Sequence, residues 1–493
     1  MLNGMTALFA RTCAGHERLS GQDAAFLSFE GPGRPMHLGA LAFVPAEKWL
    51  GSDGELDVAR LRETFVQRAR AVPALGKQLS RAPLTGWPVW VRADPARMAD
   101  HVEVSAPVAT RGEAGMIAET AMATPLNRGR PLWRLVIVPG IDDGRTFGLV
   151  FLAHHGLIDG IAGIDLLAQL LDGDGPVRQR EAPGLGVATS RQQLLGAEVL
   201  RWLELPTVVM LRGLGMATDG RRMRRALRRG QALVRTCVRL LTPGPRTVLR
   251  SDNDGRRHVA WFSIDERPVR FARRRLGGTP NDIVLAAVAE AIGEMGGSEG
   301  HVPFRKMRAA IPVSLRARSQ RYEAGNRIGL VLTPLEVRER NAGRRVSRIH
   351  GHTSVQKARG DAEGYEVLCE LTSWTGRWSQ RLLHWLAGTL HSYGVLVTNV
   401  PGPSRAYTLG GAELEEIYPL VPLFGGQAVS VGVIRYGATL HVGVLSSWRD
   451  RAMVDAFASR LEDAFARLTR AIAYEAAATR SPAPSAGTAT ADS

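Results

Sequence analysis

The residues best suited to chemistry lie in one short string, AHHGLIDG, at 153–160. It places two histidines, His154 and His155, directly after a strongly apolar segment, with Asp159 and Gly160 close behind them. A neutral imidazole has a pKa near neutrality, so it can accept the proton of a hydroxyl while that oxygen attacks a carbonyl. Asp159 could fix the loop or pair with an arginine, and Gly160 would permit a tight backbone turn. The string predicts general-base catalysis, and its structural alternative is a turn capped by two histidines.

Several other chemistries lack their sequence signatures. The chain has no HExxH string and no clustered cysteines, so no metal is expected. It has no GxSxG elbow, which disfavours a serine acyl-enzyme, and no P-loop or GxGxxG turn after a strand. Its three cysteines, Cys13, Cys237 and Cys369, are widely spaced, which excludes a disulfide scaffold and fits a reducing compartment. Direct transfer is therefore favoured over a covalent intermediate.

The elements that must position the histidines follow from the hydrophobic pattern. Residues 146–154 form an apolar run that predicts a strand ending at the histidines, and 163–173 predicts a helix behind them. A second αβ-type part begins near 256, where 281–295 predicts a helix with Asn281 at its N-cap. Reactive side chains are commonly displayed on loops at the ends of such strands. The pattern thus predicts two αβ parts joined by a long connection.

The length of the chain allows two or three domains, since it has 493 residues of which 45% are apolar. We divide it into an N-terminal part at 1–172, a connection at 173–255, a C-terminal part at 256–475 and a tail at 476–493 that is expected to be disordered. No apolar run is long enough to cross a membrane, and the N-terminus lacks the pattern of a secretory signal. A cytoplasmic protein, soluble or associated with a surface, is expected.

Most of the net charge of +16 lies in the connection, where residues 173–250 hold fifteen arginines against five acidic residues. So basic a segment is expected to meet a membrane, a nucleic acid or a phosphorylated cofactor. Nucleic acid is disfavoured, because the arginines lack interleaved aromatics and no recognised binding module is present. Residues 191–241 look helical, with Trp202 and leucines between the arginines, which suits a helix lying on an anionic membrane. The alternative is a helix packed on the protein with its arginine face in water.

At HHGLIDG the sequence resembles the acyl-CoA-dependent acyltransferases of the chloramphenicol acetyltransferase and condensation-domain superfamily. Residues 19–44, which begin LSGQDAAF, are similar to the N-terminal signature of the bacterial wax ester synthase/diacylglycerol acyltransferase family. Further blocks of that family follow in order at PLW (131–133), ND (281–282), IPVSLRAR (311–318), GNRIGLVLTPL (325–335), VTNVPGP (397–403) and 415–434. The connection aligns with nothing in the family, and Gly21 stands where the family usually has proline.

The resemblance implies an α/β (α+β) fold of two chloramphenicol-acetyltransferase-like lobes, 1–172 and 256–475, with the active site in a channel between them. It implies a fatty acyl-CoA donor and a diacylglycerol or long-chain alcohol acceptor, with acyl-CoA as a substrate and no cofactor. The partners implied are these substrates and, peripherally, a membrane or lipid-droplet surface, but no nucleic acid. A monomer or a homodimer is compatible with both lobes lying in one chain.

The resemblance also implies roles for individual residues of the histidine string. His155 would be the general base, and His154 would support the loop or the acceptor. Asp159 would be structural and paired with an arginine such as Arg316. Gly160 would lie at the substrate or oxyanion position.

Outside that string, the resemblance leaves roles with alternatives. Asn281 would stabilise the oxyanion or position the substrate, or it would only cap a helix. Asp282 would anchor local structure. Trp133 would line the acyl channel, or it would belong to the core.

Two rival functions remain at this point. Another acyltransferase of the superfamily would use a carrier-bound thioester or a non-lipid hydroxyl, which the heptapeptide alone permits. A non-catalytic lipid-droplet or membrane-coat protein could retain the fold, although the intact HHxxxDG string weighs against it.

Overall fold

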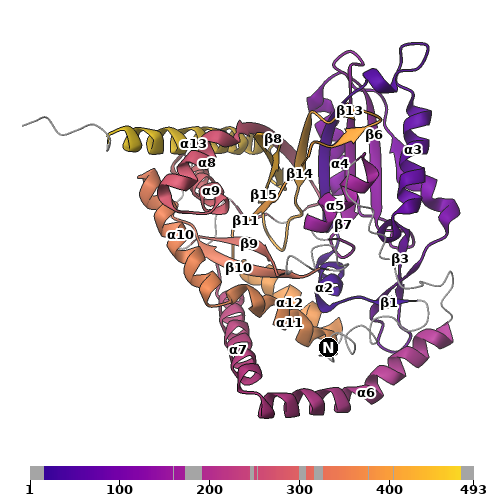
Figure 1. The fold of residues 1–493 in the computed structure, drawn as a ribbon, viewed down its shortest axis with the longest axis vertical. Helices are drawn as coiled ribbons and strands as arrows, with labels where there is room; N and C mark the ends of the chain where they lie inside the picture. Colours follow the sequence, from indigo (N-terminus) through magenta and orange to yellow (C-terminus); the bar gives the residue numbers. More distant parts are fainter. Residues whose placement is uncertain are drawn as a thin grey trace, which may run out of the picture.

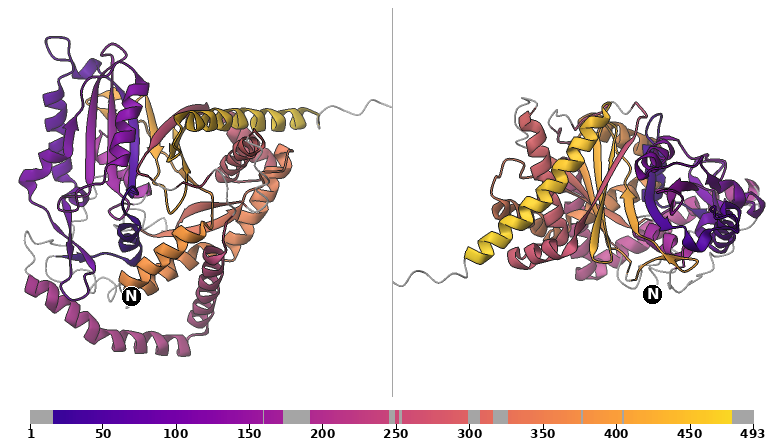
Figure 2. Two further views of the ribbon diagram at one scale, coloured as in Figure 1. Left: turned by 180° about the vertical axis from the view of Figure 1, so that it is seen from behind. Right: turned by 90° about the horizontal axis from the view of Figure 1, so that it is seen from above.

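The structure is a computed structural model that describes residues 16–158, 160–172, 191–244, 249–251, 254–298, 307–315, 326–375, 377–403 and 405–478. These residues form two lobes that lie side by side, each built of helices packed on a β-sheet (Figures 1 and 2). Each lobe has a hydrophobic core of its own. The mixed helix and sheet architecture with two lobes agrees with the fold class predicted from the sequence.

A five-stranded sheet in the order β14-β2-β7-β6-β5 forms the centre of the N-terminal lobe. Its strands are β2 (His37–Pro45), β5 (Val102–Val104), β6 (Trp133–Ile141), β7 (Thr146–His154) and β14 (Glu416–Leu420). All nine residues of β7 are buried, because neighbours on both sides and packing on both faces enclose it. That enclosure accounts for its uninterrupted apolar run and confirms the strand predicted at 146–154.

Helices and a small sheet complete the N-terminal lobe. The α-helices are α2 (Gly21–Phe29), α3 (Val58–Ala71), α4 (Arg111–Ala123) and α5 (Gly160–Leu170), with short 3-10 turns η1 (Glu47–Trp49), η2 (Pro73–Gly76) and η3 (Pro95–His101). A three-stranded sheet contains β1 (Glu17–Arg18), β4 (Pro88–Arg92) and β3 (Lys77–Arg81). The start of α2 is set by a capping box, in which Ser20 and Asp23 each bond the other's backbone N–H.

The C-terminal lobe contains a six-stranded sheet in the order β10-β9-β11-β15-β16-β8. Its strands are β8 (His258–Asp265), β9 (Arg308–Ser314), β10 (Ile328–Pro334), β11 (Val395–Val400), β15 (Val429–Tyr436) and β16 (Thr439–Ser446). Its helices are α8 (Glu266–Leu276), α9 (Pro280–Ser298), α10 (Ala342–Ala358), α11 (Asp361–Thr375), α12 (Arg377–Leu390) and α13 (Arg451–Ala478). α9 is buried between the sheet and the helices α8, α10 and α13, so its sequence is apolar on nearly every side.

A segment from the C-terminal half of the chain crosses into the sheet of the N-terminal lobe, which the sequence did not predict. β14 lies beyond most of the C-terminal lobe in sequence, yet it pairs with the edge of β2, with Glu416 opposite Phe43. The preceding hairpin of β12 (Thr408–Leu409) and β13 (Ala412–Glu413) also packs into the N-terminal core. A side chain at Gly443 of β16 would lie 2.1 Å from the Pro419 carbonyl oxygen, so glycine permits β14 to cross that sheet closely. Residues 407–420, which belong to the predicted C-terminal part at 256–475, therefore pack with the N-terminal lobe.

The connection between the lobes is helical where the structure describes it, as α6 (Arg191–Thr218) and α7 (Gly220–Leu241). α7 packs on α11, where the buried Asp361 carboxylate pairs with Arg235 at 2.7 Å and with Arg239 at 2.6 Å. Close approach of the two helices requires Gly364, since a side chain there would lie 2.3 Å from the Ala232 carbonyl oxygen. Among the described residues, no helix combines the length and apolarity needed to cross a bilayer.

Candidate active site

The two histidines of the predicted string lie where β7 ends and the chain turns towards α5. The His154 N–H donates to the Leu132 carbonyl at 2.9 Å, and the His155 N–H donates to the Met36 carbonyl at 2.8 Å. Segments adjoining β6 and β2 therefore fix the backbone of both histidines from opposite sides. Both rings are buried, but they point into different surroundings.

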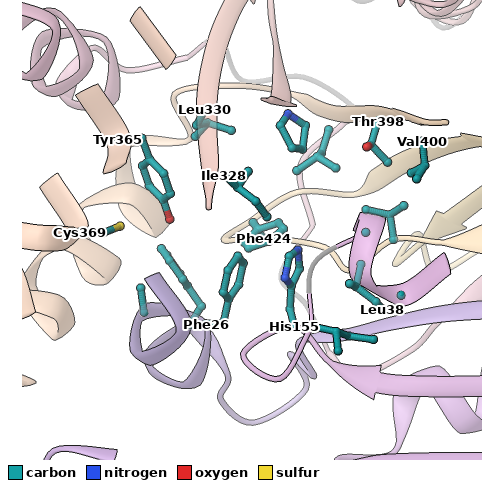
Figure 3. A pocket seen from close by; sticks show the side chains of 18 of the residues that line it. Phe26, Leu38, His155, Ile328, Leu330, Tyr365, Cys369, Thr398, Val400 and Phe424 are labelled. Carbon is teal, nitrogen blue, oxygen red and sulfur yellow. The ribbon is translucent and has the colours of Figure 1, made fainter. Parts of the chain in front are cut away.

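The His155 ring lies at the edge of a cavity of about 300 Å³ between the lobes (Figure 3). It stacks face to face on the Phe26 ring, with a centroid distance of 3.8 Å and an interplanar angle of 6°. Phe424 approaches the His155 ring edge-on at 6.4 Å. Two flat neighbours leave the imidazole little freedom to rotate, so one face and one edge remain directed at the cavity.

The cavity is apolar over most of its length. Its lining comes from both lobes and from α7 of the connection, and includes Leu38, Ile158, Leu330, Leu368, Leu386, Val400 and Phe424. A few polar groups interrupt the apolar lining, and Thr398 and Tyr365 are visible among them in Figure 3. Burial raises the pKa of Tyr365 well above its usual range, so its phenol stays protonated. A long apolar chain with one reactive group at the imidazole is the kind of ligand that fits this lining.

The histidine loop is held in place by a residue of the opposite lobe. The Asn326 Nδ2 donates to the His155 carbonyl oxygen at 2.6 Å and to Asp23 Oδ1 at 2.6 Å. The Asn326 backbone N–H also donates to Asp23 Oδ1. Gly156 is needed beside them, because a side chain there would lie 2.9 Å from the Asp23 carbonyl oxygen. Neither Asp23 nor Asn326 was predicted from the sequence as a site residue. The sequence held one signal for them, since Asp23 lies in LSGQD and Asn326 in GNRIG, and both strings are blocks that resemble the acyltransferase family.

Two further contacts dock α2, the helix that contains Asp23, onto the C-terminal lobe. The Gln22 side chain bonds both the N–H and the carbonyl of Ile328 at the start of β10. A side chain at Gly21 would lie 1.9 Å from the Cys369 carbonyl oxygen, so the close approach of α2 to α11 requires a residue without a Cβ. The departure from proline at this position therefore fits the packing of α2.

The His154 ring faces away from the cavity into a buried polar cluster. Its Nδ1 accepts the Gly156 N–H at 2.9 Å, so in the neutral ring the proton lies on Nε2. That nitrogen lies 3.8 Å from Glu30 Oε1, and His37 Nε2 lies 3.7 Å from the same oxygen. The other Glu30 oxygen accepts two hydrogen bonds from Arg128, at 2.9 and 2.6 Å. Glu30, His37, His154 and Arg128 thus form one cluster directly behind the reactive loop.

Burial decides the charge states in this cluster. It lowers the pKa of His154 to about 3 and also lowers the pKa of His37, so both rings are neutral at pH 7. Burial alone would raise the pKa of Glu30, but His37, His154 and Arg128 together lower it to about 2. The carboxylate is therefore charged and balanced by the guanidinium. Two histidines and a carboxylate could in principle bind a metal, but the Leu126 N–H donates to His37 Nε2 and so occupies the lone pair that a ligand would use.

The structure places the other predicted residues apart from one another. Asp159 and Arg316 lie outside the described residues, so their predicted pairing stays a prediction. Gly160 begins α5 and lines the cavity near His155. Trp133 is buried in the N-terminal core, where its Nε1–H donates to the Leu75 carbonyl and its ring stacks on His101. It is not among the described residues that line the cavity, which differs from the predicted channel role and agrees with the core alternative.

α9 of the C-terminal lobe begins at Pro280, so Asn281 and Asp282 lie in its first turn. The predicted N-cap at Asn281 is wrong, because Thr279 precedes the helix and its hydroxyl accepts the Asp282 N–H. Asp282 accepts hydrogen bonds from the Thr279 N–H at 2.7 Å and the Thr353 hydroxyl at 2.8 Å, and it contacts His350 at 2.9 Å. It ties α9 to α10. Asn281 is half-buried beside it and is not among the described lining residues, so the predicted oxyanion role lacks geometric support. The sequence Asn-Asp at the start of a helix looks the same whether the asparagine contacts substrate or only caps the helix.

Comparisons with known proteins agree with the geometry. Residues 19–284 match the wax ester synthase/diacylglycerol acyltransferase catalytic domain, and residues 324–469 match the WS/DGAT C-terminal domain. The first match runs through the connection at 173–255, so placing that segment outside the resemblance was wrong. A putative diacylglycerol O-acyltransferase of Mycobacterium tuberculosis is 27% identical over 452 residues, covering 88% of this chain and 86% of that protein. A second, probable diacylglycerol O-acyltransferase of that organism is 27% identical over 461 residues, covering 90% of this chain and 94% of that protein.

Solved structures show the same fold. The wax ester synthase/diacylglycerol acyltransferase from Marinobacter aquaeolei superposes with a TM-score of 0.64 at 23% identity, covering 92% of this chain and all of that chain. The first condensation domain of the CDA synthetase superposes with a TM-score of 0.57 at 16% identity, covering 93% and 96%. At these identities the superpositions establish the fold alone.

The buried cluster predicts that acid destabilises the protein through His154. The pKa of His154 is about 3 when folded and 6.5 in its ordinary state, so below pH 6.5 the unfolded chain binds a proton that the folded protein excludes. Stability present above pH 6.5 is therefore lost as the pH falls towards 3, by about 1.4 kcal/mol at pH 5.5. Urea unfolding of wild type and His154→Asn at pH 7.5 and 5.5 measures this loss. We expect the wild type to lose about 1.4 kcal/mol more than the variant.

The interval from pH 7.5 to 8.5 is the internal control, because His154 is neutral in both states there. The two proteins should not diverge over that interval. Equal losses between pH 7.5 and 5.5 would contradict a neutral, buried His154.

Proposed function

This chain belongs to the wax ester synthase/diacylglycerol acyltransferase family, and from that premise we propose that it transfers a fatty acyl group from acyl-CoA to a lipid hydroxyl. The acceptor is a diacylglycerol or a long-chain alcohol, and the product is a triacylglycerol or a wax ester. The observation that carries the proposal is the imidazole of His155, fixed at the edge of a mostly apolar cavity between the lobes. One base beside a long apolar cavity suits a hydroxyl and a thioester that both carry alkyl chains.

The proposed reaction needs only one proton acceptor. Nδ1 of His155 is buried, so Nε2 is the ring nitrogen that an acceptor hydroxyl can reach. Nε2 takes the hydroxyl proton while the oxygen attacks the thioester carbon, giving a tetrahedral oxyanion. The carbon–sulfur bond then breaks, and the CoA thiolate leaves with the proton that His155 carried. The ester and free CoA are the products, and His155 returns to its neutral form.

Packing and hydrogen bonding support the role of His155 as a base. The stacked Phe26 ring fixes the plane of the imidazole, and the Asn326 bond to the His155 carbonyl fixes its backbone. The loop is further shaped by the Gly156 N–H that bonds His154 Nδ1. A base held in one geometry avoids reorganisation when substrate binds, which is a large part of the rate that enzymes supply.

We also propose that the protein associates peripherally with a lipid surface. Most of the large apolar side chains that the described residues expose lie on α6, α7, α11 and α12, which are referred to below as the four-helix end. They are Leu195, Val199, Leu200, Trp202, Leu203, Met210, Met223, Leu227, Val234, Val238, Leu241, Leu371, Trp378, Leu382 and Trp385. These helices occupy one end of the molecule in both opposed views (Figures 1 and 2).

Charge supports the same association. The first turns of α7 carry exposed arginines at positions 221, 222, 224, 225 and 228, next to the exposed Met223 and Leu227. Apolar side chains flanked by arginines suit the interface of an anionic membrane or lipid droplet. Soluble monomers rarely expose so large an apolar area without a partner.

The first prediction of this proposal concerns the base. His155→Ala should lower acceptor-dependent release of CoA thiol by about 10²- to 10⁴-fold, because no other histidine or carboxylate is among the described residues that line the cavity. Palmitoyl-CoA with dioleoylglycerol or hexadecanol is the assay, with thiol and lipid product both measured. His352→Ala, on the surface of α10, is the matched control.

Wild-type activity in a folded His155→Ala protein would contradict the assignment. A folded wild type that releases no thiol with either acceptor would instead favour a carrier-bound donor or a non-catalytic role.

The second prediction concerns the loop. Asn326→Ala should lower kcat by about ten- to a hundred-fold with little change in KM, because it frees the His155 carbonyl without touching the substrate cavity. Asn341→Ala removes the helix cap of α10 and is the matched control. It should lower stability by about 1 kcal/mol and leave kcat unchanged. Equal kcat values for wild type and Asn326→Ala would show that the clamp has no role in catalysis.

The third prediction concerns the surface. Replacing Trp378 and Trp385 together by serine should weaken binding to phosphatidylcholine/phosphatidylserine vesicles by about ten-fold, since both indoles are mostly exposed. Met116→Ser removes an exposed apolar side chain of α4 and should leave binding unchanged. Sedimentation with vesicles at low and high salt measures both effects. Unchanged vesicle binding of the double tryptophan variant would contradict the proposal that the four-helix end contacts the lipid surface.

A further inference from the structure

Single helices of the four-helix end, among them α7 and α12, separate the cavity from the exposed apolar surface. On α7, Cys237 and Leu240 line the cavity, whereas Val238 between them is 60% exposed. α12 has the same arrangement, because Leu386 lines the cavity and its neighbour Trp385 is 62% exposed. α7 and α12 contact each other. Each helix therefore presents apolar side chains to the cavity on one face and to the outside on another.

One residue belongs to both surfaces. Leu241, the last residue of α7, lines the cavity and is also 49% exposed. The wall of the cavity is therefore only one residue thick at the C-terminal end of α7. Through Leu241 the apolar lining is continuous with the apolar outside of the four-helix end.

From this continuity we infer that the lipid acceptor enters the cavity from the lipid surface through an opening beside Leu241, between α7 and α12. The inference rests on the proposed acyl transfer and deepens it by naming the route. An acceptor that moves along this route passes from one apolar environment to another. It avoids the water that would otherwise surround its chains, and each exposed methylene would add to that penalty.

The charge distribution along α7 indicates how this opening would face a lipid surface. Its N-terminal turns carry the exposed arginines, and its C-terminal turn carries Leu241. Near α11, by contrast, Arg235 and Arg239 are less exposed and share the Asp361 carboxylate. The most exposed basic charge therefore lies at one end of α7, where only Arg222 has an acidic partner, Asp219, in the part of the chain that the structure describes, and the opening lies at the other end. An anionic lipid surface that lies along the whole helix would contact both. The occupant to which we commit is such an anionic lipid surface with its dissolved acceptor.

The test compares one embedded acceptor with one dissolved acceptor. Leu241→Arg places a charge in the opening and should lower the rate on dioleoylglycerol in phosphatidylcholine/phosphatidylserine vesicles at least ten-fold per vesicle-bound enzyme. With hexanoyl-CoA and dissolved hexanol the same variant should lose several-fold less of its rate, because a short dissolved acceptor does not depend on the route from the lipid surface. Val234→Arg adds the same charge to the same helix, on an exposed side chain that is not among the described lining residues. It should show no selective loss on the embedded acceptor.

The other outcomes are also informative. An undiminished rate of Leu241→Arg on the embedded acceptor, or an equal loss on both acceptors, would overturn the route. Leu241→Trp, which blocks the opening without a charge, should give the same selective loss and covers the case in which Leu241→Arg does not fold. A wild type inactive with both acceptors would overturn the proposed acyl transfer itself, whatever the variants do.

Discussion

The hydrogen bonds that Asp23 and Asn326 make behind His155 are the constraint on which the rest of the site depends. Asp23 belongs to the N-terminal lobe and Asn326 to the C-terminal lobe, so the position of the imidazole is defined only when the lobes are assembled. Asp23 uses its second oxygen to bond the Ser20 hydroxyl that caps α2. The helix start, the lobe interface and the reactive loop therefore share one carboxylate. Losing a partner from so buried a set costs roughly 1–3 kcal/mol per unpaired group.

A second physical theme is the transfer of alkyl chains between apolar environments. Exposing a sixteen-carbon chain to water costs on the order of 12 kcal/mol, at about 0.8 kcal/mol per methylene. An enzyme that drew such substrates through water would meet that cost in every turnover. The apolar cavity, the exposed apolar helices and the arginines of α7 are consistent with one solution, in which the substrate is met at a lipid surface. The single base beside Phe26 then completes the chemistry in a site poor in water.

The sequence was informative where local pattern and burial coincide. The apolar run of β7, the histidines at its end and the helix near 281 were predicted because each is a continuous local pattern. Asp23 and Asn326 were not, since their roles arise from contacts between segments about three hundred residues apart. For Asn281 the family resemblance left an oxyanion role and a helix cap open, because the local pattern of a helix start does not show which way the side chain faces. The role of Trp133 was open for a similar reason, because a large apolar ring suits both a hydrophobic core and an acyl channel.

The exchange of β14 has a consequence for how the protein is made. The N-terminal sheet gains its outer strand only from residues 416–420, which pair with residues 39–43. During synthesis that edge of β2 stays uncovered while most of the C-terminal lobe, as far as β11, is being translated. An uncovered strand edge is a template for wrong pairing, and contacts this distant in sequence form slowly. The two lobes are consequently one cooperative folding unit, and neither half expressed alone would contain a finished sheet and a finished site.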